Sequence, residues 1–169
     1  MFILEICVLS QRSVSILQIC VRHPRNPPPM KQTEAKHKDL TELIIKAFYA
    51  AYTILGYGFL EKVYENAMTI ELRKLGLRVV QQAPIIVSYE GQEIGHYNAD
   101  LLVEEAVLVE LKAARTLAPE HEAQLLNYLK ATPYEVGLLL NFGPDPQIKR
   151  KTYDNERKSR TQISRMDTD

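Results

Sequence analysis

The sequence predicts a mixed α/β domain with one central sheet flanked by helices. Two observations lead to this prediction. Apolar residues recur at three- and four-residue steps in the first part of the domain, and runs rich in Val and Ile then follow at strand length. The resulting order is helix, helix, three strands, helix, strand, which is typical of helices packed on a sheet. The length of 169 residues suits one such domain.

Two helices are expected first. The earlier one covers residues 33–55, where the apolar positions share one side. These positions are Leu40, Leu43, Ile44, Ala47, Phe48 and Ala51. Gly56 and Gly58 interrupt the pattern, since glycine readily adopts the left-handed conformation that ends helices. A second helix is expected over residues 59–75, ended by Gly76.

Three strands joined by short turns come next. Residues 79–89 are rich in Val and Ile, and Pro84 within them marks an edge strand or a bulge. The turn at residues 90–92 leads into a return strand over residues 94–103. A third strand is expected over residues 106–112. Its apolar run at positions 107–109 predicts burial on both faces, and therefore a central place in the sheet.

A third helix and two more strands complete the domain. Pro119 is expected to open the helix, because proline is favoured in the first helical turn, and the helix continues over residues 120–131. The apolar residues 136–141 then form a buried strand. A turn at residues 143–146 precedes a last short strand over residues 147–153.

The sequence divides into an extension, a domain and a tail. Residues 1–32 are apolar but interrupted by polar residues, and Pro27, Pro28 and Pro29 form a stiff break before Met30. The start is not basic, so a signal peptide is disfavoured, and an amphipathic or strand-like arm stays open. We expect Met30 to be the working start. The domain covers residues 33–153, and residues 154–169 form a polar tail that we expect to fray.

Charge and cysteine content narrow the class of protein. The 21 basic and 21 acidic residues cancel, which argues against a globally basic nucleic-acid coat but leaves room for a local basic groove. Cys7 and Cys20 both lie in the extension, so the domain has no cysteine and suits the reducing cytoplasm. No apolar run approaches the length needed to span a membrane.

Asp100, Glu110 and Lys112 form the strongest candidate site. Asp100 and Glu110 fall on consecutive strands joined by a short turn, which places them close together. Two neighbouring carboxylates repel each other unless a cation lies between them, and Mg²⁺ prefers such oxygen ligands. Lys112 is two residues after Glu110 and therefore projects from the same face. A carboxylate pair, a metal and an ammonium group suit hydrolysis of a phosphodiester.

A simpler interpretation stays open for this motif. Glu110 and Lys112 form an ordinary ion pair on a solvated strand if no metal binds, and such a pair contributes about 0–1 kcal/mol. The apparent burial of their strand argues against that interpretation, because buried strands rarely end in charged residues without a partner.

Two helices add further candidates. Glu61 and Tyr64 are three residues apart on the second helix, so Glu61 can face inward beside Tyr64. The alternative for Glu61 is simple stabilisation of the helix N-terminus. Gln124 and Tyr128 are four apart on the third helix, either as site residues or as an ordinary polar border. His121 is more typical of a surface or capping residue than of a ligand.

These residues together resemble a known family. Gly58-x-x-Glu61-x-x-Tyr64 resembles the name-giving motif of the GxxExxY proteins, which belong to the PD-(D/E)XK nuclease superfamily. The resemblance extends through Asp100, the Glu110-Leu111-Lys112 tripeptide, residues 121–130 and residues 137–143. It covers residues 39–153. One departure is Ala99, which stands where the superfamily has a proline before the aspartate.

The resemblance implies a nuclease-like core in the order αβββαβ. It also implies a role for each matching residue. Glu61, Asp100 and Glu110 correspond to metal ligands for Mg²⁺ or Mn²⁺, Lys112 to the catalytic lysine, Tyr64 to a supporting residue, and Gln124 and Tyr128 to the Gln-x-x-x-Tyr helix motif.

The expected function is metal-dependent hydrolysis of DNA or RNA. Lys149, Arg150 and Lys151 are candidates for phosphate contacts, although a solvated tail explains them equally well. The alternative function is a non-catalytic domain that binds nucleic acid or protein on the same fold. So small a domain, without a separate recognition module, is expected to need a homodimer or protein partner for selectivity.

Overall fold

The structure is a computed structural model that describes residues 36–156 and 158. Residues 1–32, and with them the predicted extension and Met30, lie outside the described residues. The described chain forms three helices and five strands in the predicted order. They are α1 (Lys38–Leu55), α2 (Glu61–Lys74), β1 (Val79–Tyr89), β2 (Gln92–Val103), β3 (Val107–Lys112), α3 (Pro119–Ala131), β4 (Val136–Asn141) and β5 (Gln147–Thr152). The predicted α/β class with a central mixed sheet is confirmed.

The sheet has the strand order β1-β2-β3-β4-β5. Neighbouring strands are antiparallel except for β3 and β4, which are parallel because the chain crosses over through α3 between them. The prediction that the third strand is central is confirmed, and β1, which contains Pro84, is an edge strand.

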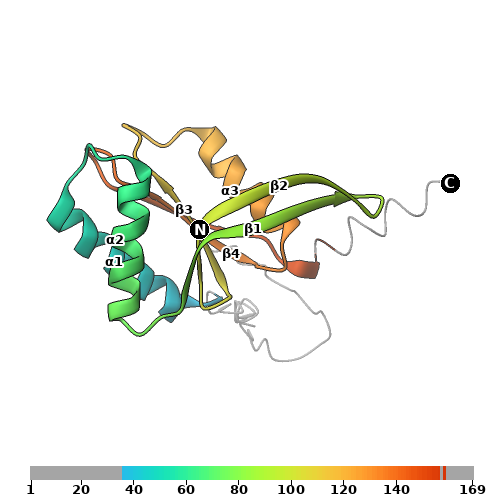
Figure 1. Cartoon of the computed structure of the whole chain (residues 1–169), viewed down its shortest axis with the longest axis horizontal. Helices are drawn as coiled ribbons and strands as arrows, with labels where there is room; N and C mark the ends of the chain where they lie inside the picture. The colour runs from blue at the N-terminus through green and yellow to red at the C-terminus, as the bar shows by residue number, and fades with distance from the viewer. Residues whose placement is uncertain (1–35, 157, 159–169) are drawn as a thin grey trace, which may run out of the picture. The chain divides into compact units, whose positions relative to one another are not determined.

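The first two strands extend far beyond the rest of the sheet. The β2–β3 ladder consists of three pairs, ending at Leu101 and Val109, whereas β2 continues to pair with β1 along its whole length. Residues 83–99 therefore form a two-stranded ribbon, here called the arm, that leaves the sheet (Figure 1). The separation of β2 from β3 creates a fork, and the candidate carboxylates lie at its base.

Helices cover both faces of the sheet. On one face, α1 and α2 bury Phe48, Tyr64 and Met68 against the odd-numbered β3 residues and against Phe142. On the other face, α3 buries Leu125 and Leu129 against Leu102, Leu108 and Leu139. The alternation along β3 follows from the two-residue period of a strand. Glu110 and Lys112 continue the even-numbered side, so they belong to the α3 face.

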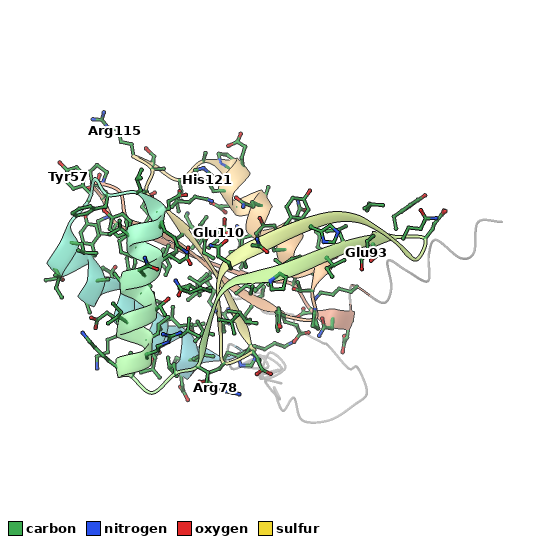
Figure 2. All side chains as sticks on the ribbon, viewed as in Figure 1. Tyr57, Arg78, Glu93, Glu110, Arg115 and His121 are labelled. Carbon is green, nitrogen blue, oxygen red and sulfur yellow. The ribbon has the colours of Figure 1, made fainter. Side chains whose placement is uncertain are left out.

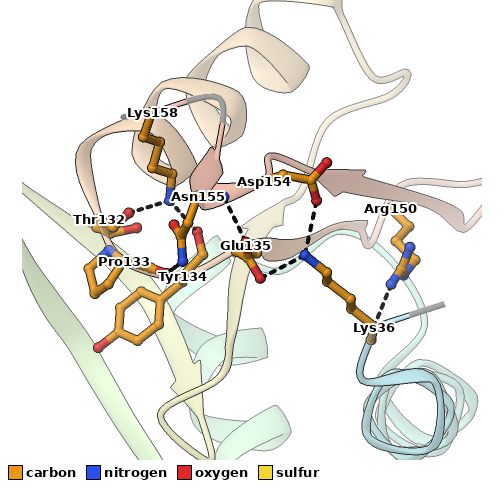
Figure 3. Close-up of polar contacts among 9 residues, drawn as sticks. All are labelled: Lys36, Thr132, Pro133, Tyr134, Glu135, Arg150, Asp154, Asn155 and Lys158. Carbon is orange, nitrogen blue, oxygen red and sulfur yellow. Dashed lines mark hydrogen bonds and ion pairs between the residues drawn. The ribbon is translucent and has the colours of Figure 1, made fainter. Parts of the chain in front are cut away.

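Polar contacts tie together the two ends of the described chain (Figure 3). Lys36 Nζ donates to Glu135 Oε2 at 3.0 Å and to Asp154 Oδ1 at 3.1 Å. Lys158 Nζ donates to the backbone oxygens of Thr132 and Tyr134. The described tail residues, 154–156 and 158, thus contact the domain, and the rest of the predicted tail lies outside the described residues.

No helix within residues 36–156 is long and apolar enough to cross a membrane.

Candidate active site

Asp100 and Glu110 meet at the base of the fork. Each lies one residue beyond the pair Leu101–Val109, the last rung of the β2–β3 ladder. There the side chain of Asp100 replaces the missing backbone partner, because its Oδ2 accepts the backbone N–H of Leu111 at 2.7 Å. Figure 2 shows Glu110 where the ribbons of β2 and β3 separate, whereas Glu93 lies far out on the arm. The predicted proximity of the two strand carboxylates is therefore present.

Lys112 donates from Nζ to Glu110 Oε1 at 2.8 Å. Their side chains are only 14% and 4% exposed, so the solvated surface pair considered as the simpler interpretation does not apply. The second oxygen, Glu110 Oε2, is the one buried side-chain nitrogen or oxygen without a hydrogen-bond partner among the described residues. A buried carboxylate oxygen without a partner is costly, so this atom is a candidate ligand for a cation.

The electrostatics of the three groups follow from burial and mutual proximity. Burial and the negative charge of Asp100 raise the pKa of Glu110 to about 7. Burial also raises the pKa of Asp100, although the Leu111 N–H and the charge of Lys112 oppose it. For Lys112, burial lowers the pKa, but the hydrogen bond to Glu110 and the surrounding carboxylates outweigh burial and raise it. The site therefore holds a protonated lysine beside carboxylates that carry an uncompensated excess of negative charge.

Glu61 approaches the same place from α2. It is the first residue of that helix, and its Oε1 accepts the backbone N–H of Ala113, just after β3, at 3.3 Å. Glu61, Ala113 and the loop residues before the helix line a hollow of about 550 Å³. The negative charge of Glu61 acts on Asp100, Glu110 and Lys112, so the helix acid and the strand residues share one site.

Tyr64 anchors the loop that presents Glu61. Its ring is fully buried and stacks on Phe142 with centroids 4.1 Å apart. Its hydroxyl donates to the Gly56 carbonyl at 3.0 Å and accepts the Phe59 N–H at 3.2 Å. Gly58, between them, has a φ of 109°, which side chains rarely tolerate. The loop delays the start of α2 from the predicted residue 59 to Glu61, and Tyr64 supports the site through this loop.

Replacing Tyr64 with phenylalanine is expected to destabilise the protein by about 1–2 kcal/mol, because the ring stays but both loop hydrogen bonds are lost. Urea unfolding measures the change. The exposed Tyr49, on α1, provides a matched control, and Tyr49→Phe is expected to leave the unfolding midpoint unchanged. Equal stabilities for wild type and Tyr64→Phe would contradict the anchoring role.

Asn141 holds the segment that follows Lys112, and sequence reasoning assigned it no role. Its buried side chain accepts the Ala114 N–H at 3.0 Å and donates to the Ala114 carbonyl at 2.9 Å. Gly143 is required beside it, because a Cβ there would lie 2.1 Å from the Ala114 oxygen. These contacts fix the backbone that directly follows Lys112, the last residue of β3. This backbone includes Ala113, whose N–H donates to Glu61. A polar residue ending an apolar strand was the available signal.

Glu65 is a second residue that sequence reasoning missed. It lies one turn after Glu61, is 3% exposed, and receives hydrogen bonds from Gln81, Gln82 and Lys62. Gln82 has a φ of 51°, and it lies at the point where the arm begins. Glu65 therefore fastens α2 to the base of the arm. A glutamate at i+4 from Glu61 was the signal in the sequence.

Gln124 and Tyr128 lie on α3 as predicted and contact each other. Gln124 Nε2 donates to Tyr128 Oη at 2.9 Å, and both residues line a groove between α3 and the arm. His121 caps the helix, since its Nδ1 accepts the Ala118 N–H at 3.2 Å, which agrees with the predicted capping role.

The candidate phosphate-binding residues lie on β5, at the edge of the sheet and two strands from β3. Lys149 and Lys151 both pair with Glu122 on α3. Arg150 donates instead to the backbone oxygen of Lys36 at 2.6 Å. The structure does not bring these three side chains to the carboxylates.

The donor set can be compared with the needs of a divalent cation. Within the described part of the chain, no three His, Cys, Asp or Glu side chains are arranged closely enough to hold a metal by themselves. Mg²⁺ does not require three, because it keeps several waters and binds through one or two carboxylates. Asp100 and Glu110 supply such a pair, and the unpartnered Glu110 Oε2 is an available ligand atom. The residues present therefore fit a hydrated divalent cation.

Comparison with known proteins identifies the superfamily of this chain. One of the similar solved structures is the crystal structure of SSO0001, at 18% identity, where the match covers 77% of this chain and 67% of that chain with a TM-score of 0.43. The alkaline exonuclease LHK-Exo from Laribacter hongkongensis, at 12% identity, covers 76% of this chain and 77% of its own with a TM-score of 0.43. No curated protein matches the sequence. Residues 38–151 match the PD-(D/E)XK nuclease superfamily, and the chain belongs to that superfamily.

Proposed function

We propose that this protein is a metal-dependent nuclease that hydrolyses phosphodiester bonds of nucleic acid. The observation that carries the proposal is the buried Lys112–Glu110 pair, in which Glu110 keeps one oxygen without a partner beside Asp100. A structural ion pair gains most when its polar atoms are all satisfied. This pair instead leaves a buried ligand atom without a partner at the base of the fork.

Each residue has a chemical task in this proposal. Asp100 and Glu110 would hold the divalent cation, and the charge of Glu61, which acts on both of them, would add to its attraction. The bound cation supplies a Lewis acid for the phosphoryl oxygen and lowers the pKa of a bound water. Lys112 keeps its proton and places an ammonium group where negative charge develops on the phosphoryl oxygens. Asn141 and Gly143 keep Lys112 at that position.

We further propose that the chain belongs to the GxxExxY branch of the superfamily and uses Mg²⁺ or Mn²⁺. The anchoring of the Glu61 loop by Tyr64 supports the first point, because it accounts for the spacing of Gly58, Glu61 and Tyr64. The all-oxygen donor set supports the second.

A cleavage assay tests the proposal. Single- and double-stranded DNA and RNA are incubated with the full chain in Mg²⁺, Mn²⁺ or EDTA. We expect cleavage with either metal and none in EDTA. Lys112→Ala is expected to lower the rate about 100- to 1,000-fold, as loss of a preorganised charge does elsewhere.

The matched control is Lys46→Ala, since Lys46 is an exposed lysine on α1. It is expected to cleave like wild type. If the pure protein cleaves nothing in any metal, or if Lys112→Ala cleaves as fast as wild type, the enzymatic proposal is wrong. Metal-independent binding of nucleic acid or protein would then be the function to pursue.

A further inference from the structure

A groove of about 1030 Å³ runs between the arm and α3 and is here called the arm–α3 groove. The residues that matter for its chemistry are Ile86, Ile94 and Tyr97 on the arm, and Gln124, Asn127 and Lys130 on α3. This volume lies just above the range of about 300–1,000 Å³ that is typical of small-molecule sites, so the groove has room for an extended ligand.

An aromatic ring is held in place on the arm side of this groove. Tyr97 is 52% exposed, and its ring lies 5.9 Å from that of Tyr128 on α3. Gly95 leaves space for the ring, because a Cβ at that position would come within 3.1 Å of Tyr97 Cε2. The ring is therefore positioned by neighbours on both sides while half of its surface remains in solvent.

Two more residues that line the groove are apolar and exposed. Ile86 is 47% exposed and Ile94 is 65% exposed. A concave site lined by apolar and aromatic residues with a few polar groups is typical of ligand binding. The polar groups across the groove, the amides of Gln124 and Asn127, can both donate and accept hydrogen bonds. Such a lining combines flat apolar contacts with adaptable polar ones.

The groove and the candidate active site lie on the same face of the sheet and border one buried cluster. Tyr128 packs in the same cluster as Leu108 of β3. Glu110 is two residues further along β3 on that same face, and Ala99, beside Asp100, also belongs to the cluster. The α3 face of the sheet therefore connects the groove with the fork where Glu110 and Lys112 lie.

We propose that the arm–α3 groove binds single-stranded nucleic acid, with one base stacked on Tyr97. This inference rests on the proposed nuclease function and specifies its substrate class. Only an unpaired strand offers the faces and edges of its bases to a ring and to side-chain amides. From such a stacked base, the sugar–phosphate backbone of the strand would run towards Lys112.

The charge distribution favours a single strand over a duplex. Duplex binding relies on many contacts from Lys and Arg to phosphates. Here the basic and acidic residues of the whole chain cancel, and Lys149 and Lys151 are paired with Glu122. The lining of the groove contains one acidic residue, Glu120, and one basic residue, Lys130. Binding energy in this groove must therefore come largely from stacking, which a duplex does not offer.

Binding in EDTA tests this inference without any cleavage. Fluorescence anisotropy compares a labelled single strand of about 12 nucleotides, within the roughly 4–16 nucleotides that single-strand-binding folds cover, with its duplex. We expect the full-length protein to bind the single strand at least tenfold more tightly. Tyr97→Ala is expected to weaken that binding about 5- to 100-fold, the range for loss of one base–aromatic stack. Tyr97→Phe keeps the stacking surface and is expected to bind like wild type.

Tyr49→Ala is the matched control, because Tyr49 is similarly exposed but lies on α1, on the other side of the sheet. It is expected to leave binding unchanged. Equal or tighter binding of the duplex, or unchanged binding by Tyr97→Ala, would overturn the inference. Loss of a dimer in Tyr97→Ala, seen by light scattering with no change in single-strand binding, would also overturn it and assign the groove to a second copy of the chain.

The binding and cleavage results separate this inference from the proposed function. Single-strand binding through Tyr97 without cleavage in any metal would support the groove and contradict the nuclease. Metal-dependent cleavage of duplex in preference to single strands would support the nuclease and contradict the groove.

Discussion

Glu110→Gln is expected to abolish metal-dependent cleavage and, at the same time, to stabilise the metal-free protein. Glutamine has nearly the shape of glutamate and can still accept the hydrogen bond from Lys112. It removes the negative charge that a divalent cation requires, and it removes the repulsion between Glu110 and Asp100. Loss of function and gain of stability therefore have one physical cause.

The direction of the stability change follows from the raised pKa of Glu110. In the unfolded chain this carboxyl ionises near its ordinary pKa of 4.5, whereas in the folded protein its pKa is about 7. Stability is present below pH 4.5 and is lost as the pH rises towards and through 7, because the folded state must then hold an unfavourable charge. The difference corresponds to at most about 3 kcal/mol. We expect Glu110→Gln to gain about 1–2 kcal/mol at pH 8, since the amide keeps a buried polar group.

Urea unfolding in EDTA at pH 5 and pH 8 measures this gain, which should be larger at pH 8. Repeating it with Mg²⁺ should stabilise the wild type, as binding to the folded state requires, and leave Glu110→Gln unchanged. Glu122→Gln is the matched control with the opposite sign. The hydrogen bond from Lys151 holds the pKa of Glu122 below its usual value, which means that the charged form of Glu122 is favourable in the folded protein. Removing this charge in Glu122→Gln should therefore not stabilise the protein. A destabilised Glu110→Gln at pH 8 would identify Glu110 as a purely structural partner of Lys112.

The elements and the strand residues of the site were predictable because they depend on local patterns. The two-residue period of a strand places Glu110 and Lys112 on one face and Leu111 on the other, where the structure buries it against α1 and α2. The short turn between β2 and β3 brings Asp100 next to Glu110. The sequence predicts the start of α2 two residues too early, because the hydrogen bonds between Tyr64 and the loop are not visible in the periodicity.

The remaining contacts depend on residues distant in sequence. Asn141 reaches back to Ala114, and Glu65 reaches forward to Gln81 and Gln82. Similarly, the run of Lys and Arg on β5 gives no sign in the sequence that Glu122 on α3 pairs with Lys149 and Lys151. Local spacing carries no information on such pairs, since they form only when the helices pack on the sheet and β4 pairs beside β3.

Asn141→Ala is expected to destabilise the protein by about 2–4 kcal/mol. The side chain is fully buried, and it satisfies both the N–H and the carbonyl of Ala114. Alanine leaves these two backbone groups without partners, and each such group costs about 1–3 kcal/mol when it is buried. Ala114 is only partly buried, so water recovers some of this loss. Cleavage should fall as well, because the backbone that carries Lys112 is no longer fixed.

Urea unfolding and the cleavage rate in Mg²⁺ are measured on the same preparations. Asn98→Ala is the matched control, since Asn98 is exposed on the arm, and both of its values should match wild type. Gly143→Ala provides an independent test, because its Cβ would press on the same carbonyl of Ala114 from 2.1 Å and displace the same segment. If both variants lose stability but keep full activity in Mg²⁺, the segment after β3 stabilises the fold without positioning Lys112. Loss of both properties together identifies the contact between β4 and this segment as the support on which the geometry of the site depends.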